Sequence, residues 1–332
     1  MDQGTNPLVS IGLPVFNGEN HLAITIAAIL NQTYPNLEIV ISDNCSTDET
    51  ESIARKAASS DQRIKYVRNP TNIGIFRNFN RTLQESSGEF FMWAAHDDFH
   101  SPSFVEECAN LMLVNPGAIM CQTRVAVCLE RLERVIYFST LNSFVDATSA
   151  WKRYRETLYN FPAVAIYGLY RAETARTLPG LRIIPGGDLL WIQELALHGD
   201  FIQSNKTLFS YIARAEWNSF ESDLKNLDKT DTIPGNSLHR TFAAFSDRRE
   251  SISRSNNSRF IKLRLLLTVV RFTTRTVLIR GLLRVFGLIS QGEALDSLKR
   301  SIYWRFLHNP NIEIFDSELF EKRVINPTLG IK

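Results

Sequence analysis

Apolar residues in the first third of the chain form short runs separated by amphipathic stretches. Residues 8–16 (LVSIGLPVF) are almost entirely apolar, which is typical of a strand covered on both faces. Further strands are predicted at 37–42, 63–68 and 88–95, while 19–31 carries apolar residues at helical spacing. Because strands and helices alternate, the pattern predicts an α/β fold with a mixed, mostly parallel sheet and right-handed crossovers.

Two capping patterns indicate where helices begin. Ser46 and Glu49 have the spacing of a capping box, which predicts a helix start directly after the second strand. Ser103 and Glu106 repeat the pattern for a helix that would end before Pro116.

After residue 117 the pattern becomes less regular. A pair of strands is predicted at 118–130 and 134–140, and two more at 163–171 and 206–214. A helix is predicted at 187–199, closed by its final glycine.

The chain therefore divides into two predicted parts. Residues 1–220 would form the α/β domain, and residues 217–235 are polar and predicted as a loop. Residues 236–332 are predicted as a C-terminal helical extension.

Composition narrows the class of protein. Of the 332 residues, 44% are hydrophobic and 22% are charged, as in soluble globular proteins. The four cysteines form no CxxC pair and no zinc spacing, so free thiols in a reducing cytoplasm are expected. Neither a signal peptide nor a membrane-spanning helix is expected from the apolar runs.

Positive charge is concentrated near the C-terminal end. Residues 251–310 contain 11 Lys and Arg against two acidic residues, although the whole chain carries only +2. Within them, 261–290 has six basic residues, no acids and many aliphatic ones. Such a helix can contact an anionic membrane surface, or it can simply pack on the domain. The segment matches no nucleic-acid-binding module, so no nucleic-acid partner is expected.

Polar groups follow three of the predicted strands. PVFNGEN, DNCSTD and HDD come after the first, second and fourth strands, and ligands of such sheets bind outside the carboxyl ends of the strands. The first turn lacks GxGxxG, and no Walker loop is present.

Adjacent Asp97 and Asp98 offer hard oxygen ligands for Mg²⁺ or Mn²⁺, which bind through few carboxylates plus substrate phosphates. Asp43 is placed to accept a hydrogen bond from a nucleobase.

These motifs together resemble a known family. VSIGLPVFNGEN and LEIVISDNCSTDET, followed by NPTNIGIFRNFNRTL and SSGEFFMWAAHDDFHSP, are similar to the start of a family 2 glycosyltransferase. The similarity is strong over 8–115 and weaker over 160–220. It implies a GT-A (Rossmann-like) fold and a nucleotide-sugar donor.

The resemblance implies a role for each matched position. The nucleotide pocket would be lined by Pro14, Phe16, Asn17, Glu19, Asp43, Arg77, Asn78 and Asp97, with Asp43 reading uracil or thymine. Asp98 would bind the metal. PGGDLLWIQELALHG points to Asp188 as the catalytic base, and YIARAEWNS points to Arg214 as a diphosphate contact.

The chain departs from the family pattern at four positions. Ala95 stands where the family often has aspartate, Asn44 where a second aspartate is common, and Gly187 where glutamate often precedes the base. Glu216 replaces a frequent histidine.

The predicted function is metal-dependent, inverting transfer of a sugar to a hydroxyl of a cell-surface glycan, lipid-linked or not. The base would remove the hydroxyl proton, and the cation would neutralise the leaving diphosphate. One alternative is a sugar-phosphate nucleotidyltransferase, but the glycine-rich basic loop that it needs is missing after the first strand. Another is a non-catalytic sugar- or membrane-binding module of the same fold.

Simpler structural roles compete at several positions. Asp43 could cap a turn, and Asp188 could cap a helix. His96 and His100 flank the two aspartates, but nothing supplies a fourth zinc ligand, so we expect both to line or flank the pocket.

Overall fold

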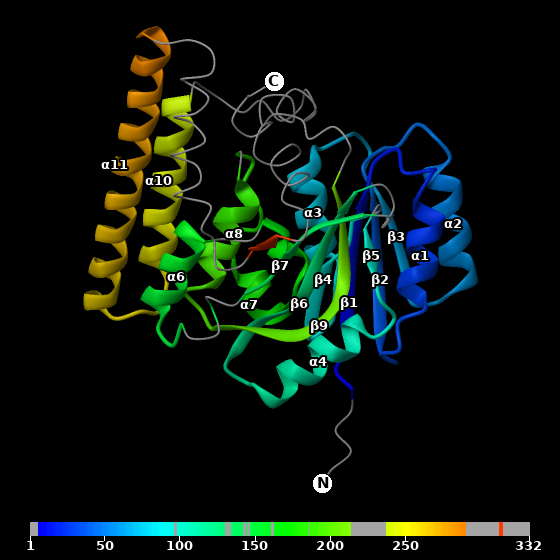
Figure 1. Ribbon diagram of the computed structural model, residues 1–332. Coiled ribbons are helices and arrows are strands. Elements are labelled where there is room, and N and C mark those ends of the chain that lie inside the picture. Colours follow the sequence, from blue (N-terminus) through cyan, green and yellow to red (C-terminus); the bar gives the residue numbers. More distant parts are fainter. Residues whose placement is uncertain are drawn as a thin grey trace.

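The strands of this chain form one sheet with helices on both faces (Figure 1). The computed structural model describes residues 6–95, 98–129, 134–141, 144, 147–160, 163–184, 186–213, 237–289 and 312–314. The strands are β1 (Val9–Val15), β2 (Leu37–Asp43), β3 (Ile64–Arg68), β4 (Phe90–Trp93), β5 (Phe99–His100), β6 (Ala118–Leu129), β7 (Arg134–Ser139), β8 (Leu169–Arg171), β9 (Asp200–Ala213) and β10 (Ile312–Ile314). They join in the order β10-β7-β6-β8-β4-β1-β2-β3, and β9 pairs with β6 and β5.

Four neighbouring strands, β3, β2, β1 and β4, run parallel. Val15 lies opposite Asp43, and Asp43 lies opposite Arg68. The carboxyl ends of β1, β2 and β3 therefore meet at one edge of the sheet, away from the amino terminus (Figure 1). β8 and β7 run antiparallel to their neighbours, so the predicted mixed, mostly parallel sheet is confirmed.

Helices cover both faces of the sheet. They are α1 (Leu22–Leu30), α2 (Thr50–Ser60), α3 (Ile75–Gln84), α4 (Phe104–Val114), α6 (Ala150–Tyr159), α7 (Ala172–Thr177), α8 (Gly187–Leu195), α10 (Ser237–Arg254) and α11 (Arg259–Ile289). Alternate side chains of β4 point to opposite faces of the sheet, so they belong to two different apolar cores. Phe90 and Met92 join the core under α1 and α4. Phe91 and Trp93 join the core under α3 and α8.

β1 and α3 approach closely at a glycine. A Cβ at position 12 would lie 2.4 Å from Thr82 Oγ1 and 2.8 Å from Phe91 Cζ. Gly12→Ala is therefore expected to lower the free energy of unfolding by about 1–3 kcal/mol in a urea titration. Gly281→Ala is the control, because a Cβ added at that position would have no other atom within 4 Å. Undiminished stability of Gly12→Ala would contradict this close approach.

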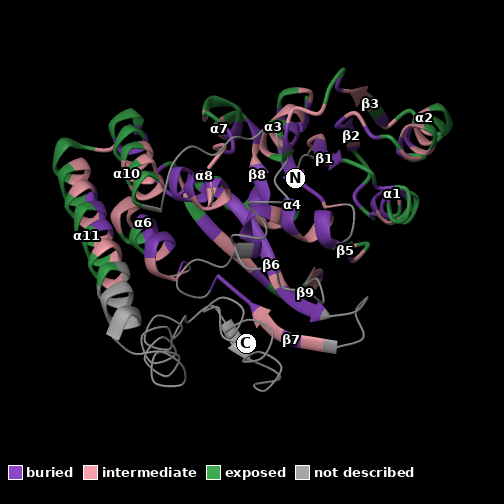
Figure 2. Cartoon of the chain, turned by 90° about the horizontal axis from the view of Figure 1, so that it is seen from above, coloured by how far each residue is buried: buried purple, intermediate pink, exposed green. Residues whose placement is uncertain are grey.

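A third apolar cluster joins the C-terminal helices to the domain. Leu265 and Val269 of α11 are buried with Tyr154 and Leu158 of α6 and Ile252 of α10. Seen from above, α10 and α11 form the outermost layer at one side of the molecule (Figure 2). The helices that the structure describes include none with the length and hydropathy needed to cross a bilayer.

Two segments differ from their predicted structure. Residues 163–167 form a 3₁₀ helix instead of the start of a strand, and only β8 continues as strand. The Tyr170 hydroxyl donates to the carbonyls of Ala165 and Ile166 at 3.0 and 2.6 Å, which holds this turn. In the region predicted as helical, residues 312–314 instead form β10 and pair with β7.

The predicted capping box of Ser46 and Glu49 is wrong. α2 begins later, at Thr50, and the side chain of its N-cap residue Glu49 makes no capping bond. The Ser46 hydroxyl instead accepts a hydrogen bond from the Asn17 amide, so it binds the loop after β1 and not the first turn of α2. Ser103 does precede α4, although its side chain makes no capping bond. The predicted loop at 217–235 lies outside the described residues.

Candidate active site

The loops after β1 and β2 are bonded to each other. The Asn17 amide donates to Ser46 Oγ at 2.9 Å, the Thr47 amide donates to Asn17 Oδ1 at 3.0 Å, and the Gly18 amide donates to Thr50 Oγ1 at 2.7 Å. Asn17 and Cys45 have φ of 49° and 64°, the only positive values among the described non-glycine residues. Such conformations persist where surrounding contacts enforce them, and they gather at binding sites.

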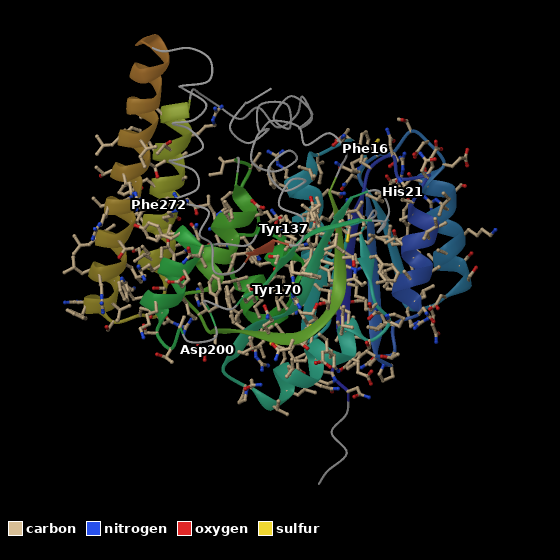
Figure 3. All side chains as sticks on the ribbon, viewed as in Figure 1. Phe16, His21, Tyr137, Tyr170, Asp200 and Phe272 are labelled. Atoms are coloured by element: carbon tan, nitrogen blue, oxygen red, sulfur yellow. The ribbon has the colours of Figure 1, made fainter. Side chains whose placement is uncertain are left out.

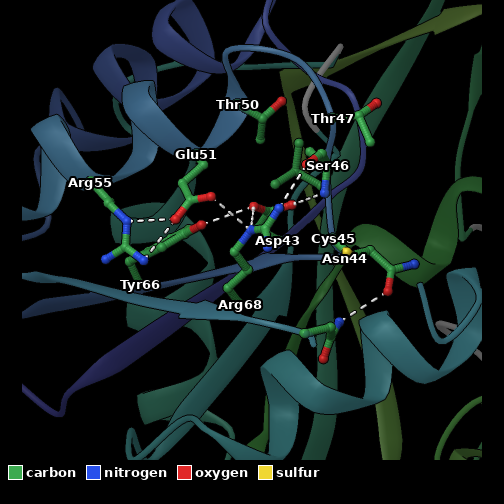
Figure 4. Close-up of polar contacts among 12 residues, drawn as sticks. Asp43, Asn44, Cys45, Ser46, Thr47, Thr50, Glu51, Arg55, Tyr66 and Arg68 are labelled. Atoms are coloured by element: carbon green, nitrogen blue, oxygen red, sulfur yellow. Dashed lines mark hydrogen bonds and ion pairs between the residues drawn. The ribbon is translucent and has the colours of Figure 1, made fainter. Parts of the chain in front are cut away.

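Asp43 stands at the base of these loops and is fully buried (Figure 4). Its Oδ1 accepts from the Ser46 amide at 2.8 Å, and its Oδ2 accepts from the Tyr66 hydroxyl at 2.9 Å and Arg68 Nε at 3.1 Å. Burial and this carboxylate raise the pKa of Tyr66. The alternative role of Asp43 as a turn cap is confirmed by the Ser46 bond. A carboxylate has about four acceptor positions, so three are occupied from within the chain.

Asn78 is also buried, and it braces strand ends. Its Nδ2 donates to the Ser42 carbonyl at 2.9 Å, and its Oδ1 accepts from Ser42 Oγ at 2.7 Å. Asn69, after β3, donates to both Asn78 Oδ1 and Asn44 Oδ1. Asn44 Oδ1 also accepts from the Ile73 amide, so these amides tie β2 to the loop before α3.

The other residues of the predicted nucleotide pocket differ in exposure. Phe16 is 45% exposed and lies at the upper edge of the sheet (Figure 3). Asn17 and Glu19 are exposed, whereas Pro14 is buried within β1. Arg77 donates to the Ile73 carbonyl at 3.0 Å, which holds the guanidinium over the start of α3.

Asp98 is buried beside β9. Its Oδ1 accepts a hydrogen bond from the Ile212 amide at 2.9 Å, and β5, which follows it directly, pairs with β9. Asp97 and Arg214, predicted to contact nucleotide and diphosphate, lie outside the described residues.

His100, expected to line or flank the pocket, has its ring in the apolar core beside β9. Its ring is buried and stacks on Phe209, with centroids 4.4 Å apart, and meets Phe104 edge-on. Burial lowers the pKa of His100 to about 3, so the ring stays neutral. Its neighbour His96 lies outside the described residues.

Asp188 lies in the first turn of α8. Gly186, with φ of 76°, occupies the N-cap position, so the alternative that Asp188 is the N-cap is wrong. Burial raises the pKa of the Asp188 carboxyl, although the amides of Asp188 and Leu189 partly offset this. Trp191, one turn later, packs edge-on against Trp93 at the end of β4, with centroids 5.4 Å apart. The first turn of α8 thus stands near the carboxyl end of β4, and a carboxylate with raised pKa is suited to accept a proton.

The described residues supply few metal ligands. They contain no group of three or more His, Cys, Asp or Glu side chains able to hold a metal ion. Mg²⁺ and Mn²⁺ can be held by one or two carboxylates together with substrate phosphates, and Asp98 is the described carboxylate that the sequence predicts for this role.

Two contributors were missed from the sequence, Tyr66 and Arg68 on β3. Both bind Asp43, and Arg68 Nη2 also donates to the Ser46 carbonyl at 2.8 Å. Both residues lie near the carboxyl end of β3, the end of a strand where ligand-binding groups are expected, but their bonds to Asp43 depend on the pairing of β3 with β2.

Comparison with known proteins agrees with this arrangement. Residues 10–163 match the profile of Glycosyl transferase family 2. An uncharacterized glycosyltransferase of Haemophilus influenzae is 36% identical over 109 residues, or 33% of this chain and 34% of that protein. One of Rickettsia typhi is 38% identical over 113 residues, or 34% of each. The matches thus span about a third of the length of these curated relatives.

Solved structures extend the likeness beyond that segment. S. aureus TarS 1-349 in complex with UDP has a TM-score of 0.59 at 15% identity, over 88% of this chain and 78% of that one. The mannosyltransferase PcManGT from Pyrobaculum calidifontis, in complex with GDP-Man and Mn²⁺, has a TM-score of 0.50 at 15% identity, over 92% and 82%. At such identity the likeness shows the fold. Residues 10–163 are thus similar to glycosyl transferase family 2 domains, and the chain shares the GT-A-like fold of these solved structures.

Proposed function

We propose that this protein transfers a sugar from a nucleotide-diphosphate donor to a hydroxyl of a glycan acceptor, with inversion at the anomeric carbon. The observation that carries the proposal is the interlocked set of loops after β1, β2 and β3, which lies within the segment matched to the family.

The donor nucleotide would lie over these loops. Phe16 offers an exposed ring to a base, and Asn17 and Glu19 are exposed beside it. Asp43 has one acceptor position beyond its three internal bonds, and a base N–H would need local movement to reach it, because the side chain is buried. TarS binds UDP and UDP-GlcNAc, and PcManGT binds GDP-Man. For this chain we favour a uridine or deoxythymidine diphosphate sugar.

A divalent cation would be held by Asp98, with Asp97 beside it, and by the donor diphosphate. When bound, the cation would stabilise negative charge on the departing diphosphate. Arg214 would contact the same phosphates. Asp188 would take the proton from the acceptor hydroxyl as that oxygen attacks the anomeric carbon.

The acceptor we propose is a glycan of the cell surface, and the compartment is the cytoplasm. The second statement is supported by the four cysteines, all of which are free, as expected in a reducing environment.

Thermal-shift measurements with nucleoside diphosphates test the donor. UDP or deoxythymidine diphosphate is expected to raise Tm, and more so with Mn²⁺, because a ligand that binds only the folded state stabilises it. In Asp98→Asn the Mn²⁺-dependent part of the shift should disappear. Glu173→Gln, an exposed carboxylate on α7, should leave the shift unchanged. Absence of a shift with every nucleotide, with and without Mn²⁺, would refute the donor assignment.

A further inference from the structure

α11 presents a row of apolar side chains to solvent. The row, which we call the α11 outer row, consists of Phe260 (71% exposed), Leu263 (57%), Leu267 (61%), Val270 (43%) and Leu278 (61%). Their spacing places them on one face of the helix. At about 1.5 Å per residue, the row is ~27 Å long.

The opposite face of α11 packs against the body of the protein. Leu265 and Val269 are buried against α6 and α10, and Trp151 of α6 donates from its indole nitrogen to Thr268 Oγ1 at 3.0 Å. Phe272 packs on Tyr159 with centroids 5.4 Å apart. The outer row therefore faces away from the body of the molecule, at its outermost helix (Figure 2).

All charged residues of α11 itself are basic. α11 contains seven basic residues and no acidic residue along its 31 positions. Arg264, Arg271 and Arg275 are exposed along one flank of the outer row. Arg264 also lies over the ring of Trp151, 3.5 Å from its centroid, so it is anchored close to the helix surface.

We propose that the α11 outer row and its flanking arginines lie on the surface of a bilayer that contains anionic phospholipid. A convex helix with aliphatic residues outward can enter the headgroup region, while arginines beside them reach the phosphates. A second copy of this chain is a poorer occupant, because two α11 helices would bring only positive charges together. The proposal concerns a partner surface and stands whether or not the sugar-transfer proposal does.

Vesicle flotation with the full chain tests the inference. The protein is expected to float with phosphatidylcholine vesicles that contain phosphatidylglycerol and to remain behind with phosphatidylcholine alone. Added salt should reduce binding, since it screens the arginines. Replacing Arg271 and Arg275 with Gln should weaken binding about fivefold per arginine.

The outer row itself is tested by the double variant Leu263→Asn/Leu267→Asn. It should lose flotation while it stays folded with only a small loss of thermal stability, because both side chains are exposed and asparagine is a somewhat weaker helix former than leucine. Val114→Asn is the matched control, since Val114 is 74% exposed on α4, and it should float like the wild type. Equal flotation of the double variant and wild type would overturn the proposal. So would a concentration-dependent dimer that the double variant abolishes, because the row would then bind a second copy. The UDP thermal shift, measured on the same variants, reports separately on the donor site.

Discussion

Asp188→Asn is expected to reduce sugar transfer by ~10²–10⁴-fold while the protein stays folded and binds its donor normally. Asparagine keeps the shape of the side chain but cannot accept a proton from an acceptor hydroxyl. Steady-state transfer assays and the nucleotide thermal shift measure the two properties. Asp61→Asn is the control, because that carboxylate forms a surface ion pair with Arg63 at the end of α2. Unreduced transfer by Asp188→Asn would remove Asp188 from the mechanism.

The same residue has a consequence for pH dependence. Burial raises the pKa of Asp188, and the residue acts as a base only when it is deprotonated. Activity should therefore be low below the raised pKa and increase as the pH rises through it, at higher pH than for an ordinary aspartate. A rate that falls over this interval would contradict the assignment.

Glu194→Ala is expected to lower the free energy of unfolding by about 3–5 kcal/mol. Glu194 of α8 is 1% exposed and binds two arginines, Arg182 in the preceding loop and Arg254 of α10, the latter at 2.9 Å. Asp247 of α10 also binds Arg182, at 2.7 Å. Removing the glutamate leaves the largely buried Arg182 with one partner fewer and breaks the ion pair between Glu194 of α8 and Arg254 of α10. Urea unfolding measures the loss.

Glu250→Ala is the matched control for that experiment. Glu250 pairs with the same Arg254, but it is 65% exposed and lies one helical turn away. Exposed pairs of this kind contribute only about 0.3–0.5 kcal/mol. Comparable losses from both variants would show that burial of Glu194 does not matter. Because α8 carries Asp188, Glu194→Ala should also slow transfer more than Glu250→Ala does.

Local patterns along the chain were sufficient for the general architecture. The apolar runs predicted β1 to β4 to within two residues at each end, and alternation with helices predicted parallel strands. Buried parallel strands require continuous apolar sequence, so this signal is local and strong. The rule that ligands lie beyond the carboxyl ends of strands points to Asp43 and Asp98 from the sequence alone.

The roles of individual polar residues required the tertiary structure. Asp43 and Asn78 were predicted to face the nucleotide, yet both are buried and bonded within the chain. Their partners lie on other strands: Tyr66 and Arg68 are 23 and 25 residues away from Asp43. No pattern within one segment identifies such partners.

The sequence by itself therefore determined the class of fold, the edge of the sheet where chemistry is expected, and a basic, apolar segment near the C-terminal end. Only the tertiary structure decided that His100 is a neutral core residue, that Ser46 holds a loop instead of a helix, and which face of α11 remains exposed. The physical reason is that periodicity records burial along one element, whereas a hydrogen bond or a free surface depends on elements distant in sequence.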